Sequence, residues 1–290
     1  MNVLIADSGS TKTDWCLMEK TSDNASSASQ KPSLRISTQG INPVHQDETT
    51  IQQILNDELL PLLPQDLELS EVDFYGAGCA GNYQEKMEKV LQETLRLSIG
   101  NIHVFSDLLA AARALCGKEK GLACILGTGS NSCLYDGVGI VRNIPPLGYI
   151  LGDEGSGAVL GRLFLNALFK DDLPAELRDE FLAESQLTYP AIIDQVYRQP
   201  LANRFLASLS KFIFSHLSVP EVRELVIGNF QSFIQKNILK YQRPDLVLNA
   251  VGSVAFYYQE ELEEACRREN IVMGRVMKTP IEGLITYHSL

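Results

Sequence analysis

One pattern occurs twice in this sequence, and the repetition limits the possible folds more than any other feature. In each copy an apolar segment runs into a polar turn and then into a second apolar segment, first in NVLIADSGSTKTDWCLME and later in GLACILGTGSNSCLY. Each copy predicts a β-hairpin. A second echo follows in the same order, because VDFYGAGCAG and LVLNAVGSVA each predict a buried strand, a glycine turn and a helix. Two echoes in one order indicate a duplicated α/β domain.

The segments around these echoes define the expected domains. Helices are predicted at 48–60 and 82–97 and a strand at 102–105, so strands and helices alternate and part of the sheet is parallel. Aligning the two polar turns places Asp7 opposite Gly127. The expected boundaries are an N-terminal domain at 1–105, a C-terminal domain at 106–280 with a helical insert at about 155–240, and a last helix at about 281–290 that packs back on the N-terminal domain.

The composition is that of a globular chain without a large basic surface. Of the 290 residues, 45% are hydrophobic and 21% are charged, which fits two domains that need no disulfide or metal for stability. The formal net charge is −11, so no basic stripe is expected to bind nucleic acid or an anionic membrane. A phosphate ligand is still compatible with this charge, because backbone N–H groups and Mg²⁺ bind phosphate without a basic surface.

Neither a secretory signal nor a membrane span is predicted. The segment MNVLIADSGS reaches the acidic Asp7 after an apolar run too short for a signal peptide, and no apolar run approaches the ~20 residues that span a bilayer. The six cysteines form no CxxC pair, and the four histidines lack metal-ligand spacing of the HExxH kind. We therefore expect a cytoplasmic protein with reduced, mostly buried thiols.

The first polar turn, DSGSTKTD, has the chemistry of a phosphate-binding loop. Its glycine allows close approach to the backbone, its hydroxyls and lysine can hold phosphate oxygens, and Asp7 could orient Mg²⁺ through water. A polar turn without a ligand explains this segment equally well when it is taken alone, and GxxxxGK[ST] is absent. The matching second turn favours the phosphate interpretation, because two facing hairpins would clamp a triphosphate. The residues predicted to bind phosphate are Gly9, Ser10, Thr11, Lys12 and Thr13, with Gly127, Thr128 and Gly129 in the second copy.

The segment GAGCAG matches GxGxxG, the glycine pattern of dinucleotide-binding loops. It follows a predicted strand and opens a helix, and the acidic Asp107 ends the next strand, as in a dinucleotide fingerprint. Two other interpretations remain open. The glycines could form a wall where substrate meets the backbone at Gly78 and Cys79, or they could serve tight packing of strand on helix.

Asp107 stands at the junction of a predicted strand and an alanine-rich helix. One interpretation is a helix N-cap, made by Ser106 or Asp107. The other is a carboxylate at the carboxyl end of a parallel strand, where open α/β sheets bind their ligands. The two interpretations are compatible with each other.

A glycine-rich loop, PPLGYILGDEGSG, carries Asp153 and Glu154 at the start of another predicted helix. Capping and compensation of the helix dipole explain acidic residues at such a position. A carboxylate there could also accept hydrogen bonds from sugar hydroxyls. Further along, Gly252 and Ser253 follow VLNAV and open a helix where the adenosine end of a nucleotide could lie.

Taken together and in order, these pieces resemble the actin/hexokinase/Hsp70 ATPase superfamily, and within it the group of N-acetylglucosamine kinases and BadF/BadG-type ATPases. DSGSTKTD is similar to the first phosphate motif of this group, and FSDLLAA with LGTGSN to the catalytic strand and second phosphate motif. LGDEGSG, VGSVA and PIEG resemble the acidic sugar loop, the adenosine motif and the closing segment. The resemblance covers nearly the whole chain. It implies an α/β fold of two duplicated actin-like (ribonuclease H-like) domains with an interdomain cleft.

The resemblance also implies roles for single residues. Asp107 is similar to the general base of these kinases, and Thr128 to a phosphate-binding threonine. The residues that the resemblance places at or near the sugar are Asn42, Ser130, Asn131, Gly148, Tyr149 and Asp153.

The implied function is phosphorylation of an amino sugar, first of all N-acetylglucosamine at its 6-hydroxyl, with ATP and Mg²⁺. One alternative is an ATPase that activates another enzyme, although such activators bind an iron–sulfur cluster through cysteines whose motif Cys116, Cys124 and Cys133 do not reproduce. A nicotinamide-dependent oxidoreductase using GAGCAG and a non-catalytic sugar-binding regulator are the others. The expected partners are a small sugar and ATP, and a homodimer is left open.

Overall fold

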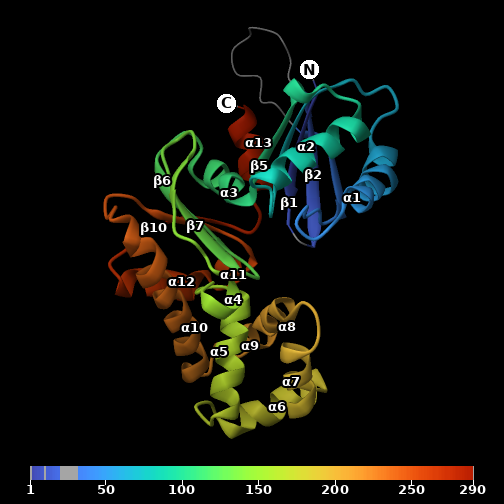
Figure 1. Cartoon of the computed structure of the whole chain (residues 1–290). Helices are drawn as coiled ribbons and strands as arrows, with labels where there is room; N and C mark the ends of the chain where they lie inside the picture. The colour runs from blue at the N-terminus through green and yellow to red at the C-terminus, as the bar shows by residue number, and fades with distance from the viewer. Residues whose placement is uncertain (1, 10, 20–31, 290) are drawn as a thin grey trace. The chain divides into compact units, whose positions relative to one another are not determined.

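The computed structural model describes residues 2–9, 11–19 and 32–289 (Figure 1). The chain forms two compact units. The first comprises Met1–Lys118 and Pro280–Leu290, and the second comprises Glu119–Thr279. Each unit is built around its own five-stranded sheet.

The first unit has a mixed sheet with helices on both faces. Its strands lie in the order β3-β2-β1-β4-β5, with β1 antiparallel to β2 and parallel to β4, and with β4 parallel to β5. The strands are β1 (Asn2–Ser8), β2 (Lys12–Glu19), β3 (Pro32–Gln39), β4 (Leu69–Gly76) and β5 (Ile102–Ser106). The helices are α1 (Glu48–Ile54), α2 (Asn82–Leu95), α3 (Asp107–Cys116) and α13 (Ile281–Ser289).

Successive side chains of a strand point to opposite faces of its sheet. On β1 and β4 both sets include apolar side chains, so the sheet has two apolar faces. Leu4 and Phe74 belong to the core that packs α1 and α2 against one face. Ile5 and Tyr75 belong to the core that packs α3 and α13 against the other. The carboxyl ends of β4 and β5 therefore emerge between two helical layers.

The predicted helix at 48–60 changes type along its length. Asp47 caps α1 by accepting the N–H of Thr50 at 2.8 Å. After α1 the chain continues as a π-helical turn at Leu55–Leu59 and a 3₁₀ turn at Leu60–Leu62. The second turn contains Pro61, which has no N–H to donate to a helical carbonyl, so the α-helical ladder stops before it.

The C-terminal helix α13 packs on α3. A Cβ atom on Gly283 would lie 2.4 Å from the carbonyl oxygen of Ala114, so glycine is what allows this approach. Arg35 on β3 forms a two-pronged ion pair with Glu282 of α13. Helix α13 therefore belongs to the first unit, although it comes from the C-terminal end of the chain.

The boundary between the units follows α3 and lies between Lys118 and Glu119. The sequence had placed it before residue 106, at the end of the preceding strand. The difference has a packing cause, because Ala110 and Ala114 of α3 are buried in the core shared with β1, β4 and α13. Helix α3 therefore completes the first unit.

The second unit repeats the strand order of the first. Read from its other edge, the sheet runs β8-β7-β6-β9-β10, with β6 antiparallel to β7 and parallel to β9. The predicted duplication is therefore confirmed at the level of topology. The strands are β6 (Gly121–Leu126), β7 (Ser130–Tyr135), β8 (Ile140–Asn143), β9 (Leu248–Val251) and β10 (Met273–Met277).

Helices fill the connection between β8 and β9. Leu122 and Leu126 of β6 share one large core with Phe164 of α5 and Phe230 of α10. None of the helices within the described residues is long and apolar enough to cross a bilayer. The helices of this unit are α4 (Gly148–Leu151), α5 (Gly157–Phe169), α6 (Ala175–Ser185), α7 (Tyr189–Tyr197), α8 (Ala202–Ser208), α9 (Ser210–Ser215), α10 (Pro220–Phe233), α11 (Ser253–Tyr257) and α12 (Gln259–Arg268).

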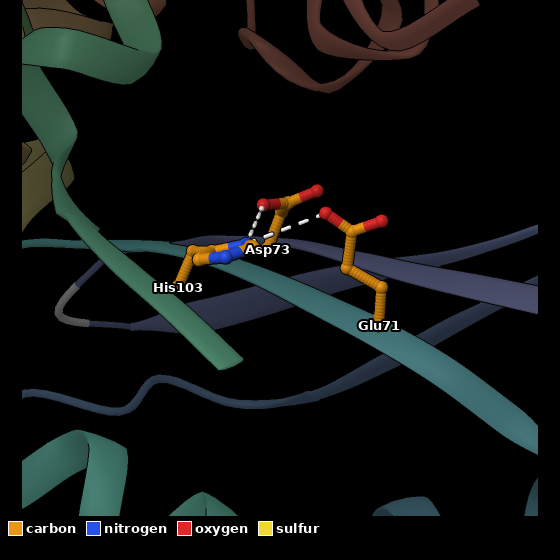
Figure 2. A group of neighbouring side chains, drawn as sticks. All are labelled: Glu71, Asp73 and His103. Carbon is orange, nitrogen blue, oxygen red and sulfur yellow. Dashed lines mark hydrogen bonds and ion pairs between the residues drawn. The ribbon is translucent and has the colours of Figure 1, made fainter. Parts of the chain in front are cut away.

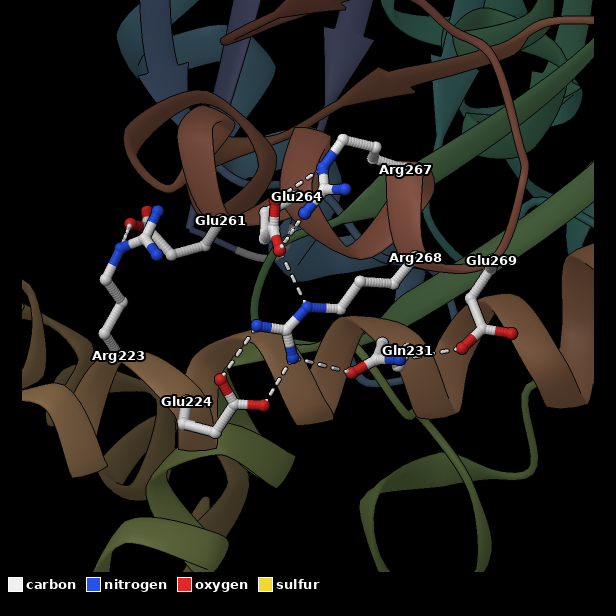
Figure 3. Close-up of polar contacts among 8 residues, drawn as sticks. All are labelled: Arg223, Glu224, Gln231, Glu261, Glu264, Arg267, Arg268 and Glu269. Atoms are coloured by element: carbon white, nitrogen blue, oxygen red, sulfur yellow. Dashed lines mark hydrogen bonds and ion pairs between the residues drawn. The ribbon is translucent and has the colours of Figure 1, made fainter.

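A polar network joins α10 to α12 on the surface of the second unit (Figure 3). Arg268 donates from Nη2 to Glu224 at 3.0 Å and from Nε to Glu264 at 2.8 Å. Gln231 and Glu269 add a further link at 2.8 Å between Nε2 and Oε1. These contacts join the two helices outside their shared apolar core.

Candidate active site

The turn between β1 and β2 exposes part of the predicted phosphate-binding set. Gly9, Thr11 and Lys12 are exposed, and Nζ of Lys12 lies 2.8 Å from Oδ1 of Asp14. Ser10, also predicted to bind phosphate, lies outside the described residues. A backbone turn, a hydroxyl and an ammonium group are suitable donors to phosphate oxygens.

Thr13 does not join this set. Its side chain is fully buried, and its hydroxyl hydrogen-bonds with Ser8 Oγ at 2.7 Å and donates to the carbonyl oxygen of Gln39 at 3.1 Å. It also accepts the N–H of Ile41 at 3.2 Å. The prediction of Thr13 as a phosphate ligand is therefore corrected. Side chains alternate along β2, and Thr13 faces the interior at the point where Lys12 faces solvent.

Carboxylates gather at the ends of β1 and β5 in the first unit. Asp7 on β1 is the register partner of Asp14 on β2. Burial raises the pKa of Asp7 to about 7, and the negative charges of Asp14 and Asp107 raise it in the same direction, against the opposing effect of Lys12. Burial also raises the pKa of Asp107. Oxygen donors of this kind fit Mg²⁺, whose charge would relieve their mutual repulsion.

The structure separates the two interpretations of Asp107. Ser106 is the N-cap of α3, and its Oγ accepts the N–H of Leu109 at 3.2 Å. Asp107 is the first residue of the helix, and its Oδ1 accepts the N–H of Leu108 at 2.8 Å. Because the cap is supplied by its neighbour, Asp107 has no essential capping role. Its carboxylate lies at the carboxyl end of a parallel strand, as the functional interpretation requires.

Two of the predicted substrate residues meet where GAGCAG leaves β4. A Cβ atom on Gly78 would lie 2.6 Å from Oδ1 of Asn42, and the φ angle of Gly78 is +78°. The same oxygen of Asn42 accepts the N–H of Val44 at 3.0 Å. Cys79 is buried, and burial raises the pKa of its thiol to about 12. This geometry shows close packing around Gly78, and contact of Asn42, Gly78 and Cys79 with a substrate stays a prediction.

In the second unit, the turn between β6 and β7 is seated on the start of α5. The carbonyl oxygen of Gly127 accepts the N–H of Gly157 at 2.8 Å, and that of Thr128 accepts the N–H of Ala158 at 3.1 Å. Ser156, which is fully buried, caps the helix. The predicted phosphate-binding residue Thr128 is exposed on this turn.

The structure matches the residues of the two hairpins differently from the sequence alignment. The N–H of Gly9 donates to the carbonyl oxygen of Lys12, and the N–H of Gly127 donates to that of Gly129, each at 3.0 Å. Each donor directly follows the first strand of its hairpin. Gly127 therefore corresponds to Gly9 and not to Asp7. The alignment of Asp7 with Gly127 is thus two residues out of register with the strand ends.

Asp153 lies against the same turn and gathers other predicted sugar-binding residues. A Cβ atom on Gly129 would lie 3.1 Å from Oδ2 of Asp153. Burial raises the pKa of Asp153 to about 6, and the N–H groups of Ser130 and Gly148, which donate to its carboxylate, oppose the shift. The φ angle of Asp153 is +52°, a left-handed conformation for a residue other than glycine. A strained, partly buried carboxylate of this kind is a common feature of binding sites.

Asn131 and Tyr149, also predicted near the sugar, occupy separate surroundings in the second unit. Oδ1 of Asn131 accepts a hydrogen bond from Nδ2 of Asn143 at 2.8 Å. Tyr149 lines an apolar cavity of about 570 Å³ together with Phe169 and Tyr189. A role of either residue at the sugar stays a prediction.

Gly252 and Ser253 adjoin a cavity suited to a nucleoside. A Cβ atom on Gly252 would lie 2.3 Å from the carbonyl oxygen of Leu126, and the φ angle of Gly252 is +125°, so only glycine fits without displacement. Ser253 lines a cavity of about 440 Å³. Apolar walls with a few polar groups are typical of nucleotide pockets. The other lining residues are Ala207, Ser208, Ser210, Lys211, Phe214, Val254, Tyr257 and Tyr258.

The sequence did not predict the residues that α8 and α9 bring to this cavity. Lys211 and Phe214 come from the helical insert and meet Tyr257 only through tertiary packing. The exposure of Phe214 (45%) and Tyr257 (48%) is the feature that marks them in the structure. Large aromatic side chains left exposed beside a cavity often mark a binding site.

Comparisons with known proteins show the family and the fold of the chain. The sequence matches no model of a protein family and none of the curated proteins searched. Among solved structures, a candidate N-acetylglucosamine kinase of Porphyromonas gingivalis is 48% identical, with a TM-score of 0.91 over 99% of this chain and 98% of that one. The chain belongs to the N-acetylglucosamine kinase and BadF/BadG-type group of the actin/hexokinase/Hsp70 superfamily. The predicted family is thus confirmed, and it is a family of ATP-dependent phosphotransferases.

More distant structures share the fold. A candidate N-acetylglucosamine kinase of Chromobacterium violaceum is 19% identical, with a TM-score of 0.72 over 99% of this chain and 98% of that one. MreB 5 of Spiroplasma citri is 10% identical, with a TM-score of 0.54 over 99% and 94% of the two chains. The prediction of actin-like α/β domains is therefore confirmed.

Proposed function

We propose that this member of the kinase group transfers the γ-phosphoryl group of ATP to the 6-hydroxyl of N-acetylglucosamine. The observation that carries the proposal is the carboxylate of Asp107, placed at the carboxyl end of β5 beside Asp7 and not used as a helix cap. The 48% identity to a candidate N-acetylglucosamine kinase supports the choice of sugar.

Asp107 acts as the general base in this proposal. Its carboxylate accepts the proton of the sugar hydroxyl as the oxygen attacks phosphorus. Burial raises the pKa of Asp107, and a base whose pKa is closer to the working pH accepts a proton more readily. The hydrogen bond from the N–H of Leu108 holds the carboxylate in place during this step.

Asp7 is the residue proposed to orient Mg²⁺, through water. When bound, Mg²⁺ neutralises the charge of the phosphate oxygens. Asp7 must be ionised for this role, and a nearby cation would lower the pKa that burial and its acidic neighbours now raise to about 7. Lys12 and Thr11 on the adjacent turn would bind the phosphates themselves.

The second unit supplies the remaining contacts of the proposal. Thr128 and Gly129 bind phosphate at the β6–β7 turn, and the adenosine occupies the cavity beside Ser253. In this proposal the carboxylate of Asp153 accepts hydrogen bonds from hydroxyl groups of the sugar, and the amide of Asn42 hydrogen-bonds with the sugar as well.

The test is a sugar-dependent phosphorylation assay. The purified chain would be incubated with ATP and Mg²⁺ and with N-acetylglucosamine, N-acetylmannosamine, glucosamine or glucose, and the product identified by ³¹P and ¹H NMR. We expect N-acetylglucosamine to give the highest kcat/KM and a phosphate coupled to the protons on C6. The 6-deoxy sugar is the matched control and should give no product.

Three results would contradict the proposal. Phosphate on another oxygen would overturn the 6-hydroxyl assignment, and a higher kcat/KM for another sugar would overturn the choice of substrate. Hydrolysis of ATP at the same rate with and without every sugar would favour the ATPase that activates another enzyme.

A further inference from the structure

A second group of ionisable side chains lies on the sheet of the first unit, away from the strand ends that carry Asp107 (Figure 2). Asp73 on β4 is the register partner of His103 on β5, and Glu71 precedes Asp73 on the same face of β4. Asp73 lies three residues before Gly76, the last residue of β4. At about 3.3 Å per residue, the group lies roughly 10 Å back from the end of the strand.

His103 faces both carboxylates, as Figure 2 shows. Its Nδ1 lies 3.1 Å from Oδ1 of Asp73 and 3.4 Å from Oε1 of Glu71. One ligand atom from each of the three residues lies within 4.8 Å of the other two. In a tetrahedral zinc site with bonds of about 2.0–2.1 Å, neighbouring ligand atoms are roughly 3.3 Å apart. The two measured separations thus match edges of such a tetrahedron.

A second observation comes from α13, on the other side of Asp73. Nδ1 of His288 lies 3.4 Å from Oδ2 of Asp73, the oxygen that does not face His103. Nε2 of His288 lies 2.9 Å from the hydroxyl of Tyr75, to which Arg113 donates at 2.7 Å. Outer polar contacts to a carboxylate help to fix its direction when it binds a metal ion.

We propose that Glu71, Asp73 and His103 bind one divalent transition-metal ion, of which Zn²⁺ is the best match. One imidazole nitrogen and two carboxylate oxygens supply three ligands and leave a fourth position for water. A nitrogen ligand favours Zn²⁺ over Mg²⁺, which prefers oxygen ligands throughout. The ion is therefore distinct from the Mg²⁺ of the proposed reaction.

The burial of the three residues suits an ion that enters from solvent and stabilises the unit. The Asp73 side chain is 4% exposed, whereas those of Glu71 and His103 are 27% and 41% exposed. A bound ion would hold Asp73 toward β5 and, through His288, hold α13 on the sheet. Without an ion, Nδ1 of His103 hydrogen-bonds with Oδ1 of Asp73 at 3.1 Å, and this is the competing explanation.

The experiment is a titration of the metal-free full-length chain with ZnCl₂ at pH 7.5 by calorimetry, without nucleotide or sugar. We expect one Zn²⁺ per chain, a higher Tm, and no displacement by millimolar Mg²⁺. Co²⁺ in place of Zn²⁺ should give the visible absorption of a four-coordinate site. His103→Ala and Glu71→Gln are each expected to weaken binding at least about tenfold, because each removes a ligand.

His45→Ala is the matched control. His45 is an exposed histidine of the same unit outside the cluster, so its loss should leave Zn²⁺ affinity unchanged. Circular dichroism would show that each variant is folded, and Asp73→Asn is avoided because Asp73 is buried. No stoichiometric Zn²⁺ binding by the natural chain would overturn the proposal, as would a Zn²⁺ affinity of His103→Ala and Glu71→Gln equal to that of the natural chain. Either result would leave the hydrogen bond between His103 and Asp73 as the explanation.

Discussion

The two units share a strand order but differ in what their first turns present. The turn of the first unit carries ionisable side chains, with Asp7, Lys12 and Asp14 close together and Asp107 nearby. The turn of the second unit is mainly backbone, with Thr128 exposed and its carbonyl oxygens bonded to the start of α5. The repeated sheet fixes where a turn lies, whereas the turn residues decide what it can bind.

This difference follows from how a hairpin is held together. The ladder of β1 and β2 depends on backbone hydrogen bonds and on inward-facing side chains such as Thr13, so outward residues of the turn can change without loss of the fold. One copy can then carry acid–base groups while the other carries backbone contacts. The proposed kinase uses the first unit for proton transfer and the second for the nucleoside.

Asp107→Asn tests the chemistry assigned to the first unit and should have the largest effect. Asn can still accept the N–H of Leu108 but cannot take a proton. We expect kcat to fall by about 10²–10⁴, with the KM for ATP nearly unchanged. The pKa of Asp107 is raised. As pH is lowered, the activity of the natural enzyme should therefore begin to fall at a pH above about 3.9, the usual pKa of a carboxyl group. The variant should lack this acid limb.

Asp47→Asn is the matched control for that substitution. Asp47 also accepts a backbone N–H, from Thr50 at 2.8 Å, but as the N-cap of α1. Asn caps about as well as Asp, so kcat should remain that of the natural chain. If Asp107→Asn were as active as Asp47→Asn, Asp107 would not be the base.

Gly252→Ala tests whether the second unit depends on the close approach of the backbone at Gly252 to the backbone at Leu126. The new Cβ would meet the carbonyl oxygen of Leu126 at 2.3 Å, at a φ angle of +125°. Such strain costs about 1–3 kcal/mol, so we expect a lower Tm and weaker ATP binding, measured by thermal unfolding and calorimetry. Gly127→Ala is the stability control, because its Cβ would meet nothing within 4 Å. Equal Tm values for the two variants would contradict the close approach.

Asp7→Asn tests whether the buried negative charge of Asp7, near Asp14 and Asp107, destabilises the first unit. The pKa of Asp7 is about 7 in the folded chain and 3.8 for an unperturbed carboxyl, so folding favours the protonated form. Its stabilising effect is complete below about pH 4 and is lost as pH rises to about 7. Asn mimics the protonated form. The variant removes the cost of burying a charged carboxylate beside Asp14 and Asp107. It should therefore raise the Tm at pH 8, by roughly 2–4 °C per kcal/mol of destabilisation removed, and change it little at pH 4.

Asp136→Asn in the second unit should give the opposite sign. The N–H groups of Gly139 and Val138 donate to Asp136 and lower its pKa. Its contribution to stability is therefore present above the unfolded pKa and is lost as pH falls. At pH 8 the variant should lower the Tm slightly. A rise in Tm for both Asp7→Asn and Asp136→Asn would mean that net charge, and not local crowding, controls the response.

The parts of the molecule that the sequence predicts are those set by local pattern. Short apolar segments separated by Gly, Ser and Thr define both hairpins, and β4 and β9 follow from the second echo. Strand β10 was not predicted. Its Gly274 and Arg275 are exposed, so the segment lacks the alternation of apolar and polar residues that indicates a strand. The buried position of Thr13 depends on contacts with Ser8 and Gln39, and so on the pairing of three strands.

The site is predictable in its residue types and less so in its geometry. Asp107 and Asp153 are marked by their places after a strand and before a helix. The pKa of Asp7 is raised mainly by burial and then by the charges of Asp14 and Asp107. The contact of Asp153 with Gly129 depends on a left-handed backbone. Neither has a signal in the local sequence, because both result from long-range packing.

Arg268→Ala should have the smallest effect and concerns the second unit alone (Figure 3). Arg268 joins Glu264 on its own helix to Glu224 on α10, whose side chain is 60% exposed. Exposed ion pairs contribute about 0–1 kcal/mol, so the Tm should fall by no more than roughly 4 °C. High salt should reduce the difference by screening. Arg267→Ala is the control, because Arg267 pairs with Glu264 within α12. A larger loss that persists in salt would show that α10 and α12 depend on this link and not on their apolar core.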